Sequence, residues 1–296
     1  MAFFVGLLLF AGSLWGLINF TPVQNLLVKK VAAVLSQKLH TKVEVKHVDF
    51  SLFNNMLIEG LLVEDKQKDT LLYAGTAKVR ITDWFFIKDK ATLKYLGLNN
   101  TVINLNRTDS VWNYQFLIDY FSSPKKSNST KKGIEFEFKV VEMENFRLNQ
   151  IDKWVGKDLK VSINKFNITA DTLDLTKNIF AISNISLDKP VFYQNNYTGN
   201  RPALTSVIKA SIKADTLSKY KWNNDGWVIN IKKLLINDGS FQNERETERL
   251  PYTDRFDGQH FLFSAITGNL KHIKFIHDTL TVDINLATKE KSGFEI

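Results

Sequence analysis

The residues of this chain that could do chemistry are few and dispersed. Five histidines are present, at His40, His47, His260, His272 and His277. His272 and His277 are five positions apart on a strand-like pattern, which places them on opposite faces and prevents them from holding one metal ion. The sequence contains no nucleophile elbow, phosphate-binding glycine loop or His-Glu-x-x-His motif. We therefore expect no enzyme activity, catalytic residue, metal site or cofactor.

A second recurring feature is the triplet Asp-Thr-Leu, which begins at Asp69, Asp171, Asp215 and Asp278. Asp and Thr favour turn starts, so the triplets predict turns between strands, as does the segment from Asn237 to Phe241. The triplets are also similar to the acceptor motif for O-glycosylation of periplasmic proteins in some Gram-negative bacteria. Under that alternative, which we favour less than turn formation, the acceptors would be Thr70, Thr172, Thr216 and Thr279.

The composition restricts the class of protein. The 296 residues are 44% hydrophobic, enough for one or two domains with a buried core. The absence of cysteine excludes disulfides and thiolate metal sites. The net charge of +8 could indicate nucleic acid or an anionic membrane, but the charges are scattered singly, apart from a lysine cluster between Lys125 and Lys132. No basic helix or aromatic-basic RNA motif accompanies them, so we expect no nucleic-acid partner.

The first segment predicts a membrane anchor. No side chain from Ala2 to Phe20 is charged, and this length is close to the ~20 residues that cross a hydrocarbon core. A cleaved signal peptide is the alternative, but it would have a basic start and a shorter apolar core. Lys29 and Lys30 follow the segment, so the positive-inside rule alone does not fix its orientation. The anchor residues are Phe3, Phe4, Leu7, Leu8, Leu9, Phe10, Leu14, Trp15, Leu17, Ile18 and Phe20.

A helix and then strands follow the anchor. Thr21 and Pro22 suit the start of a helix, and apolar residues recur at helical spacing to His40, which predicts an amphipathic helix over 21–40 that caps the next domain. From Val43 onward apolar and polar residues alternate, which indicates an antiparallel sheet with one apolar face. We expect a transmembrane anchor over 1–20, a β module over 41–121, a polar loop over 122–133 and a second β region over 134–296 that continues beyond the sequence.

The order of these features resembles a known family. After the anchor come TPVQNLLVKKVAAVLSQKL at Thr21–Leu39, TKVEVKHVDFSLFNNMLIEGLLVED at Thr41–Asp65 and DTLLYA at Asp69–Ala74. These segments resemble the N-terminal part of AsmA-like proteins, and among them the TamB type. The likeness is specific over residues 1 to about 105 and depends on the strand pattern alone beyond that.

The resemblance implies a mainly β protein in which an elongated antiparallel sheet curls into a hydrophobic groove. It implies a single-pass anchor in the bacterial inner membrane and a body in the periplasm. In that family the groove is thought to carry phospholipid towards the outer membrane, and the TamB type is linked to outer-membrane protein assembly and secretion with an outer-membrane barrel partner. That partner belongs with a C-terminal domain that nothing in this sequence matches.

The alternation of the strands predicts which side chains line the apolar face. An exposed apolar face of several hundred Å² is unusual in a soluble monomer, so acyl chains or a second sheet must cover it. The alternative is a membrane-anchored structural or protein-binding β-sandwich with the same residues in its core. The predicted lining residues are Phe136, Phe138, Val140, Leu159, Val161, Ile163, Trp227, Ile229, Ile231, Phe261, Phe263, Val282 and Ile284.

Overall fold

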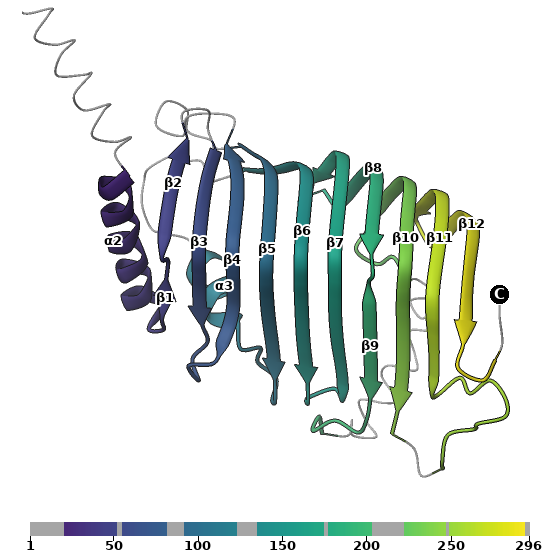
Figure 1. Cartoon of the computed structure of the whole chain (residues 1–296). Helices are drawn as coiled ribbons and strands as arrows, with labels where there is room; N and C mark the ends of the chain where they lie inside the picture. The colour runs from purple at the N-terminus through teal and green to yellow at the C-terminus, as the bar shows by residue number, and fades with distance from the viewer. Residues whose placement is uncertain are drawn as a thin grey trace, which may run out of the picture. The chain divides into compact units, whose positions relative to one another are not determined.

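The structure is a computed structural model (Figure 1) and is described for residues 21–51, 55–81, 92–122, 135–174, 177–202, 222–246 and 249–293. Strands predominate, which confirms the predicted β-rich fold class. The chain forms two compact units, one from Met1–Ile103 and Asn113–Phe136 and the other from Asn104–Trp112 and Glu137–Ile296. The predicted anchor residues and most of the predicted polar loop lie outside the described residues. Neither described helix is both long and apolar enough to cross a membrane.

The first unit contains two helices and a small antiparallel sheet. Helix α2 spans Thr21–Leu39, where the sequence predicts a helix to His40, and α3 spans Gln115–Ser122. The strands are β1 (Val43–Glu44), β2 (His47–Ser51), β3 (Asn55–Glu64), β4 (Thr70–Ile81) and β5 (Thr92–Arg107), and the end of β5 belongs to the second unit. The sheet order is β1-β3-β4-β5, and β2 also pairs with β3.

Helix α2 covers the edge of this sheet with its own polar side chains. The Ser36 hydroxyl donates to the Val43 carbonyl at 3.0 Å and accepts from the Val43 amide at 2.8 Å. The Asn25 carbonyl oxygen accepts from the Val48 amide at 2.8 Å. Unpaired backbone groups at a sheet edge are a site of unwanted pairing, so these bonds protect the edge.

The first Asp-Thr-Leu triplet lies at a turn, as predicted. The turn between β3 and β4 is organised by Asp65, whose carboxylate accepts from the backbone amides of Gln67 and Asp69 at 2.9 and 3.0 Å. The side-chain amide of Asn113 donates to the same carboxylate at 2.9 Å. Asp65 is buried, and these donors satisfy its oxygens.

The second unit is built around a single sheet. Its strands are β6 (Glu135–Asp152), β7 (Lys157–Asp174), β8 (Ile179–Asp188), β9 (Val191–Asn196), β10 (Val228–Arg245), β11 (Phe261–Ile276) and β12 (Thr279–Glu290). The order is β6-β7-β8-β10-β11-β12, and β9 continues the line of β8 between β7 and β10. No described helix belongs to this unit.

The sheet of the second unit is mixed, which differs from the antiparallel sheet predicted. Strand β10 runs parallel to both β8 and β9, whereas the other pairs are antiparallel. The alternation of β8 and β10 is equally compatible with either direction, because side chains alternate between faces in both.

A line of backbone irregularities crosses the second unit at right angles to the strands. We call this line the crease and define it by Asn145 in β6, Asn164 in β7, Lys189–Pro190 between β8 and β9, Asp238–Gly239 in β10, and Ala265 in β11. The strand registers place these positions side by side. Four of them have positive φ, with values of 52° at Asn145, 48° at Lys189, 50° at Asp238 and 49° at Ala265.

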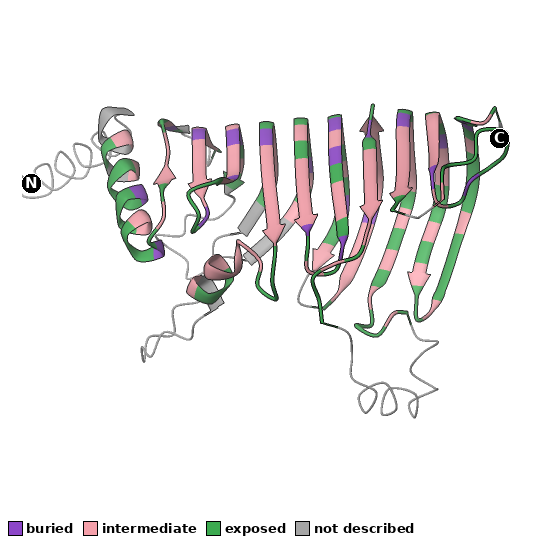
Figure 2. Ribbon diagram, turned by 90° about the horizontal axis from the view of Figure 1, so that it is seen from below, coloured by how far each residue is buried: buried purple, intermediate pink, exposed green. Residues whose placement is uncertain are grey.

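The crease bends the strands. A residue with positive φ interrupts the extended backbone, and Asn and Asp tolerate this conformation better than most residues. Figure 2 shows the strands of the second unit bent along their length. The segment Asn237–Phe241 lies at this bend inside β10, so the prediction that it forms a turn between two strands is wrong. The Asp171 triplet likewise lies inside β7, at a register shift and not at a turn.

Candidate functional site

The strand registers of the second unit bring apolar side chains into continuous rows on one face of the sheet. Directly opposed residues on neighbouring strands point to the same face, so each register line defines a row. We call this face the inner face and define it by the buried residues Val161, Ile163, Ala170 and Ile182. The opposite face is called the outer face.

On one side of the crease, a single row crosses five strands. It consists of Leu148, Val161, Phe192, Phe241 and Phe263, in the order β6, β7, β9, β10, β11. The rings of Phe241 and Phe263 both pack against Phe261, with centroids 5.5 and 5.4 Å apart. The next row outward, at the strand ends, contains Gln194 and Asn243, whose side-chain amides are hydrogen-bonded at 3.2 Å. Over β9 and β10 the apolar row therefore has a polar border.

On the other side of the crease, three apolar rows follow one another. The row nearest the crease contains Met143, Phe166, Leu187, Ile236, Gly268 and Leu286. The second contains Val141, Ile168, Ile185, Leu234, Leu270 and Ile284. The third, near the other ends of the strands, contains Leu173, Phe180, Ile229, Phe275 and Leu280.

The apolar side chains stay on one face of the sheet through the crease. In β7, Val161 and Ile163 are buried before it, and Phe166 and Ile168 are half-buried after it. Asn164 and Lys165 lie between these pairs, and both are exposed. Two successive exposed residues shift the alternation by one position. The inner-face residues of β7 are therefore odd-numbered before the crease and even-numbered after it, and the same face remains apolar.

The inner side of the crease is closely packed. A Cβ atom added to Gly239 would lie 3.1 Å from a methyl carbon of Ile236, 3.2 Å from Pro190 and 3.4 Å from Ile266. Side chains from β10 and β11 and from the segment between β8 and β9 thus meet at Gly239. Val161 and Ile163, which lie next to the crease on this face, are both buried.

The outer side of the crease is polar. Asp188 accepts hydrogen bonds from the side-chain amides of Asn164 at 2.8 Å and Asn237 at 2.7 Å, so that the three residues link β7, β8 and β10. These bonds hold the pKa of the Asp188 carboxyl below its ordinary value. A bend with an apolar inside and a hydrogen-bonded outside gives the sheet a concave apolar face.

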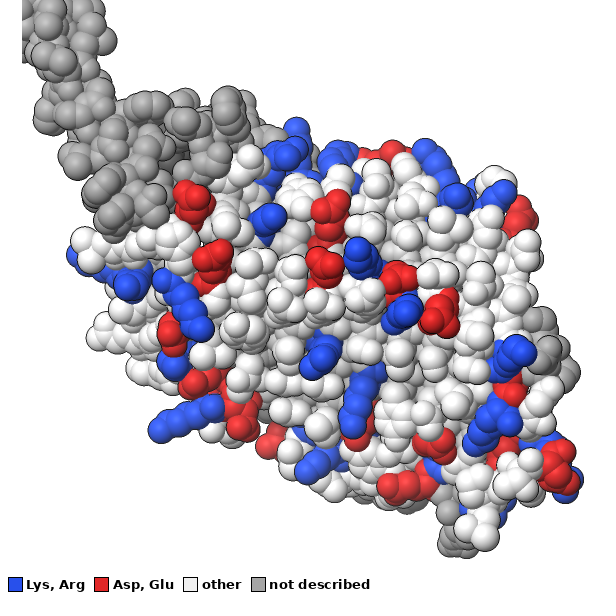
Figure 3. Space-filling view, viewed as in Figure 1, with Lys and Arg blue, Asp and Glu red and all other residues white. Residues whose placement is uncertain are grey.

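A second polar group lies on the outer face, further along the strands. Asp171 of β7 accepts from the Ser183 hydroxyl at 2.8 Å and from the Lys232 ammonium group at 2.9 Å. The ion pair with Lys232 and the bond from Ser183 lower the pKa of Asp171. Because all three groups are exposed or half-exposed, this group fixes which face of β7, β8 and β10 meets water. Figure 3 shows acidic and basic side chains interspersed over the face in view, without a large area of one sign.

Most of the predicted lining residues that the structure describes lie in the inner rows or beside them. Val161, Phe263, Ile229 and Ile284 belong to the rows, and Ile231 lies in register with Ile182. Trp227 packs against Phe180 with ring centroids 5.0 Å apart. Phe261 is opposite Asn243, Leu159 is opposite Gln194, and Ile163 is buried beside the crease. Phe138 and Val282 are half-buried, and the Phe136 side chain lies outside the described part.

Val140 is placed differently from the prediction. Its partner in β7 is Thr169, which is exposed, whereas the next residue, Val141, is buried opposite Ile168. Val140 therefore faces the outer side, with Glu142, and Val141 takes the inner position. The alternation from Phe136 to Val140 does not continue into the next segment of β6, and the sequence alone did not reveal where it changes.

Several inner-face residues were missed by the sequence analysis. They include Phe192, Phe241, Ile185, Leu234 and Leu270. Phe241 was assigned to a turn, and Leu234 belongs to the run Leu234-Leu235-Ile236, whose alternation is hidden because three apolar residues are consecutive. Its register with Ile185 and Leu270 identifies Leu234 as inner and Leu235, opposite Ser186 and Asn269, as outer.

The candidate glycosylation sites and the histidines do not gather. Thr172 and Thr279 are exposed, Thr70 is half-buried, and Thr216 lies outside the described residues. His260 is buried and paired with Glu244, and His272 is exposed and paired with Asp283, both at 2.7 Å. Among the described residues, no group of three His, Asp or Glu side chains has a geometry that could hold a metal ion.

Comparison of the chain with protein-family models and with curated proteins finds no match in either set.

Proposed function

We propose that this protein is a TamB- or AsmA-like component of a bacterial cell envelope, which holds the acyl chains of phospholipid against the inner face of its second unit. In this proposal residues 1–20 anchor the chain in the inner membrane and the sheet lies in the periplasm. Lipid held in this way supports outer-membrane biogenesis, with or without assistance to outer-membrane protein assembly and secretion. The resemblance of residues 1 to about 105 supports the envelope location.

The observation that supports lipid binding is the set of apolar rows. The row through Leu234 crosses six strands without a polar member, from Val141 in β6 to Ile284 in β12. At its far end Ile284 is 63% exposed. A row that is buried at one end and open at the other offers apolar surface that a ligand can cover.

Acyl chains suit this surface for a physical reason. Each methylene group moved from water to an apolar surface gains about 0.8 kcal/mol, so two acyl chains in transit through water would face a barrier of tens of kcal/mol. A continuous apolar face removes most of that barrier. The hydrophobic contact between an acyl chain and the inner face is non-directional and involves no catalytic group.

Lipid analysis of the purified full chain tests the proposal. We expect phospholipid to co-purify with the protein and to decrease in Leu270→Gln, which puts a polar amide into an inner row. Leu235→Gln is the matched control, because Leu235 is also half-buried but lies on the outer face. Absence of lipid from protein that is folded by circular dichroism, or equal loss in both variants, would favour a closed sandwich core and reject the proposal.

A further inference from the structure

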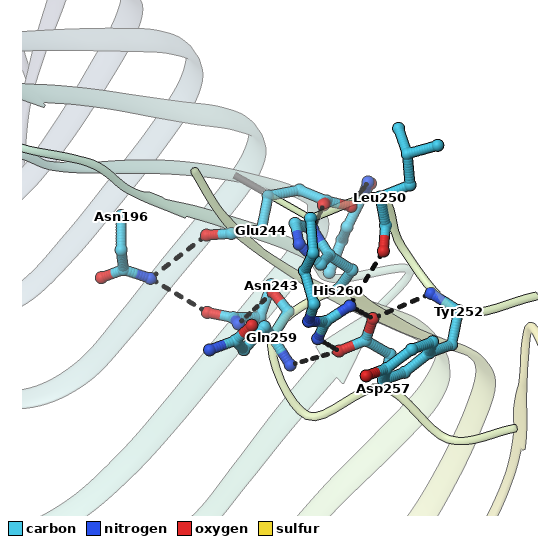
Figure 4. A network of polar contacts seen from close by, with 10 residues as sticks. Asn196, Asn243, Glu244, Leu250, Tyr252, Asp257, Gln259 and His260 are labelled. Atoms are coloured by element: carbon cyan, nitrogen blue, oxygen red, sulfur yellow. Dashed lines mark hydrogen bonds and ion pairs between the residues drawn. The ribbon is translucent and has the colours of Figure 1, made fainter. Parts of the chain in front are cut away.

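The loop between β10 and β11 is held by a buried carboxylate. The guanidinium group of Arg249 donates to both oxygens of Asp257, at 2.7 and 2.5 Å. The backbone amides of Tyr252 and Gln259 donate to the same carboxylate, each at 3.0 Å (Figure 4). The Arg249 ion pair holds the pKa of Asp257 well below its ordinary range. The loop from Arg249 to His260 is therefore fixed from the inside.

Two further contacts attach this loop to the sheet. His260 pairs with Glu244 of β10 at 2.7 Å, and the Gln242 amide donates to the other oxygen of Glu244 at 2.9 Å. Burial acts to raise the pKa of Glu244, but the bonds from Gln242 and His260 hold it below the ordinary value. The ring of Phe256 stacks on that of Phe261, with centroids 5.8 Å apart. Since Phe261 packs against the inner rows, the loop lies at the end of the inner face.

The loop displays apolar side chains to solvent. Leu250 is 86% exposed, Phe256 52% and Tyr252 41%. In Figure 4 the Leu250 side chain points away from the polar network. The centroid of the Tyr252 ring lies 4.1 Å from the guanidinium carbon of Arg249 and 4.7 Å from the guanidinium carbon of Arg255. The loop thus buries the Asp257 carboxylate and presents leucine, tyrosine and phenylalanine to solvent, beside the exposed ion pair of Asp254 and Arg255.

We propose that the loop from Arg249 to His260 docks onto the surface of a phospholipid bilayer. Leucine and phenylalanine enter the outer part of the hydrocarbon, tyrosine favours the interface, and arginine meets lipid phosphate while its stem stays in apolar surroundings. A leucine that protrudes this far is convex, and lipid accommodates a convex shape, whereas a protein partner would need a matching pocket.

The inference deepens the proposed function and rests on it, because it names the membrane contact through which lipid reaches the inner face. Phe256 links the two, since it is exposed on the loop and stacked on Phe261. Docking at this loop would place the polar border of the inner face, at Gln194 and Asn243, beside the lipid headgroups.

Site-directed fluorescence quenching tests the docking. The chain has no cysteine, so single cysteines can carry a fluorophore without background labelling. The full-length protein would be labelled at Leu250→Cys in the loop, at Leu234→Cys on the inner face, or at Val191→Cys, an exposed apolar control next to the crease. Each is reconstituted in phosphatidylethanolamine and phosphatidylglycerol vesicles that contain doxyl-labelled phospholipid.

We expect loss of fluorescence at position 250 and none at position 191. Fluorescence retained at 250 but lost at 234 would overturn the docking inference and leave the lipid-binding face in place. Fluorescence retained at both 250 and 234 would overturn both proposals. Equal loss at 250 and 191 would also overturn the docking, because the contact would then not be specific to the loop.

Discussion

Replacement of Ile163 by alanine tests whether the crease is a packed core. Ile163 is 8% exposed and lies on the inner face opposite Phe146. The change removes three carbon atoms, each worth about 0.8 kcal/mol of transfer free energy, and leaves a cavity that collapses only in part. We expect the free energy of unfolding to fall by about 2–4 kcal/mol.

Thermal unfolding of the full chain, followed by far-ultraviolet circular dichroism, measures this loss. At about 2–4 °C per kcal/mol for a unit of this size, the transition of the second unit should move down by roughly 4–16 °C. Ile284→Ala is the matched control, because Ile284 is on the same face but 63% exposed, and it should lose less than about 1 kcal/mol. Equal losses, or a loss below about 1 kcal/mol for Ile163→Ala, would refute a packed crease.

Three more predictions concern the end of the second unit where β6 turns into β7. Gly156→Ala should destabilise the protein strongly, because φ at this position is 81° and an added Cβ would lie 2.0 Å from the Tyr197 carbonyl oxygen. Gly226→Ala is the control, because φ is 67° but the space around it is open, so it should lower the free energy of unfolding in urea by only about 1–2 kcal/mol. Asp152 is buried, which acts to raise its pKa, but bonds from Arg107 and the Val155 amide hold the pKa below its ordinary value. The stabilising contribution of Asp152 is therefore present above about pH 4 and is lost as the pH falls through its lower pKa in the folded protein. Asp152→Asn should make the free energy of unfolding depend less on pH in acid. An unchanged dependence would count against a stabilising pair of Asp152 and Arg107. Burial and the hydrogen bond to Asp158 raise the pKa of Tyr197 to about 12. The contribution of Tyr197 to stability is therefore present below about pH 10 and lost as the pH rises towards 12. An ultraviolet titration of Tyr197→Phe should show one late-ionising tyrosine fewer than that of the unchanged protein.

The alternation of apolar and polar residues was sufficient to predict the strands and one apolar face. It fails where the backbone leaves the extended conformation. Asn145 and Asp238 shift the alternation by one position, and nothing in a single sequence distinguishes such a residue from one in a turn. The segment from Asn237 to Phe241 therefore resembles a turn in the sequence although it lies inside β10, whereas the misplacement of Val140 comes from a change of alternation before Val141.

The loop between β10 and β11 was also beyond the sequence patterns. Acidic and basic residues alternate from Glu244 to Arg249, a pattern that is typical of a solvated loop. In the structure Glu244 pairs with His260, and Arg249 pairs with Asp257, which is buried. These pairs join residues 8 and 16 positions apart, across a loop whose path determines which partners meet. Periodicity reports the local conformation and carries no information about that path.

Photo-crosslinking in living cells tests the central claim most directly. A photoreactive amino acid at Leu234 would lie on the inner face, and one at Leu235 would lie on the outer face of the same strand. The two positions are adjacent, share the same native residue and are both half-buried. We predict phospholipid attached through position 234 and not through 235. Lipid at neither position in folded protein, or equal attachment at both, would contradict a lipid-binding inner face.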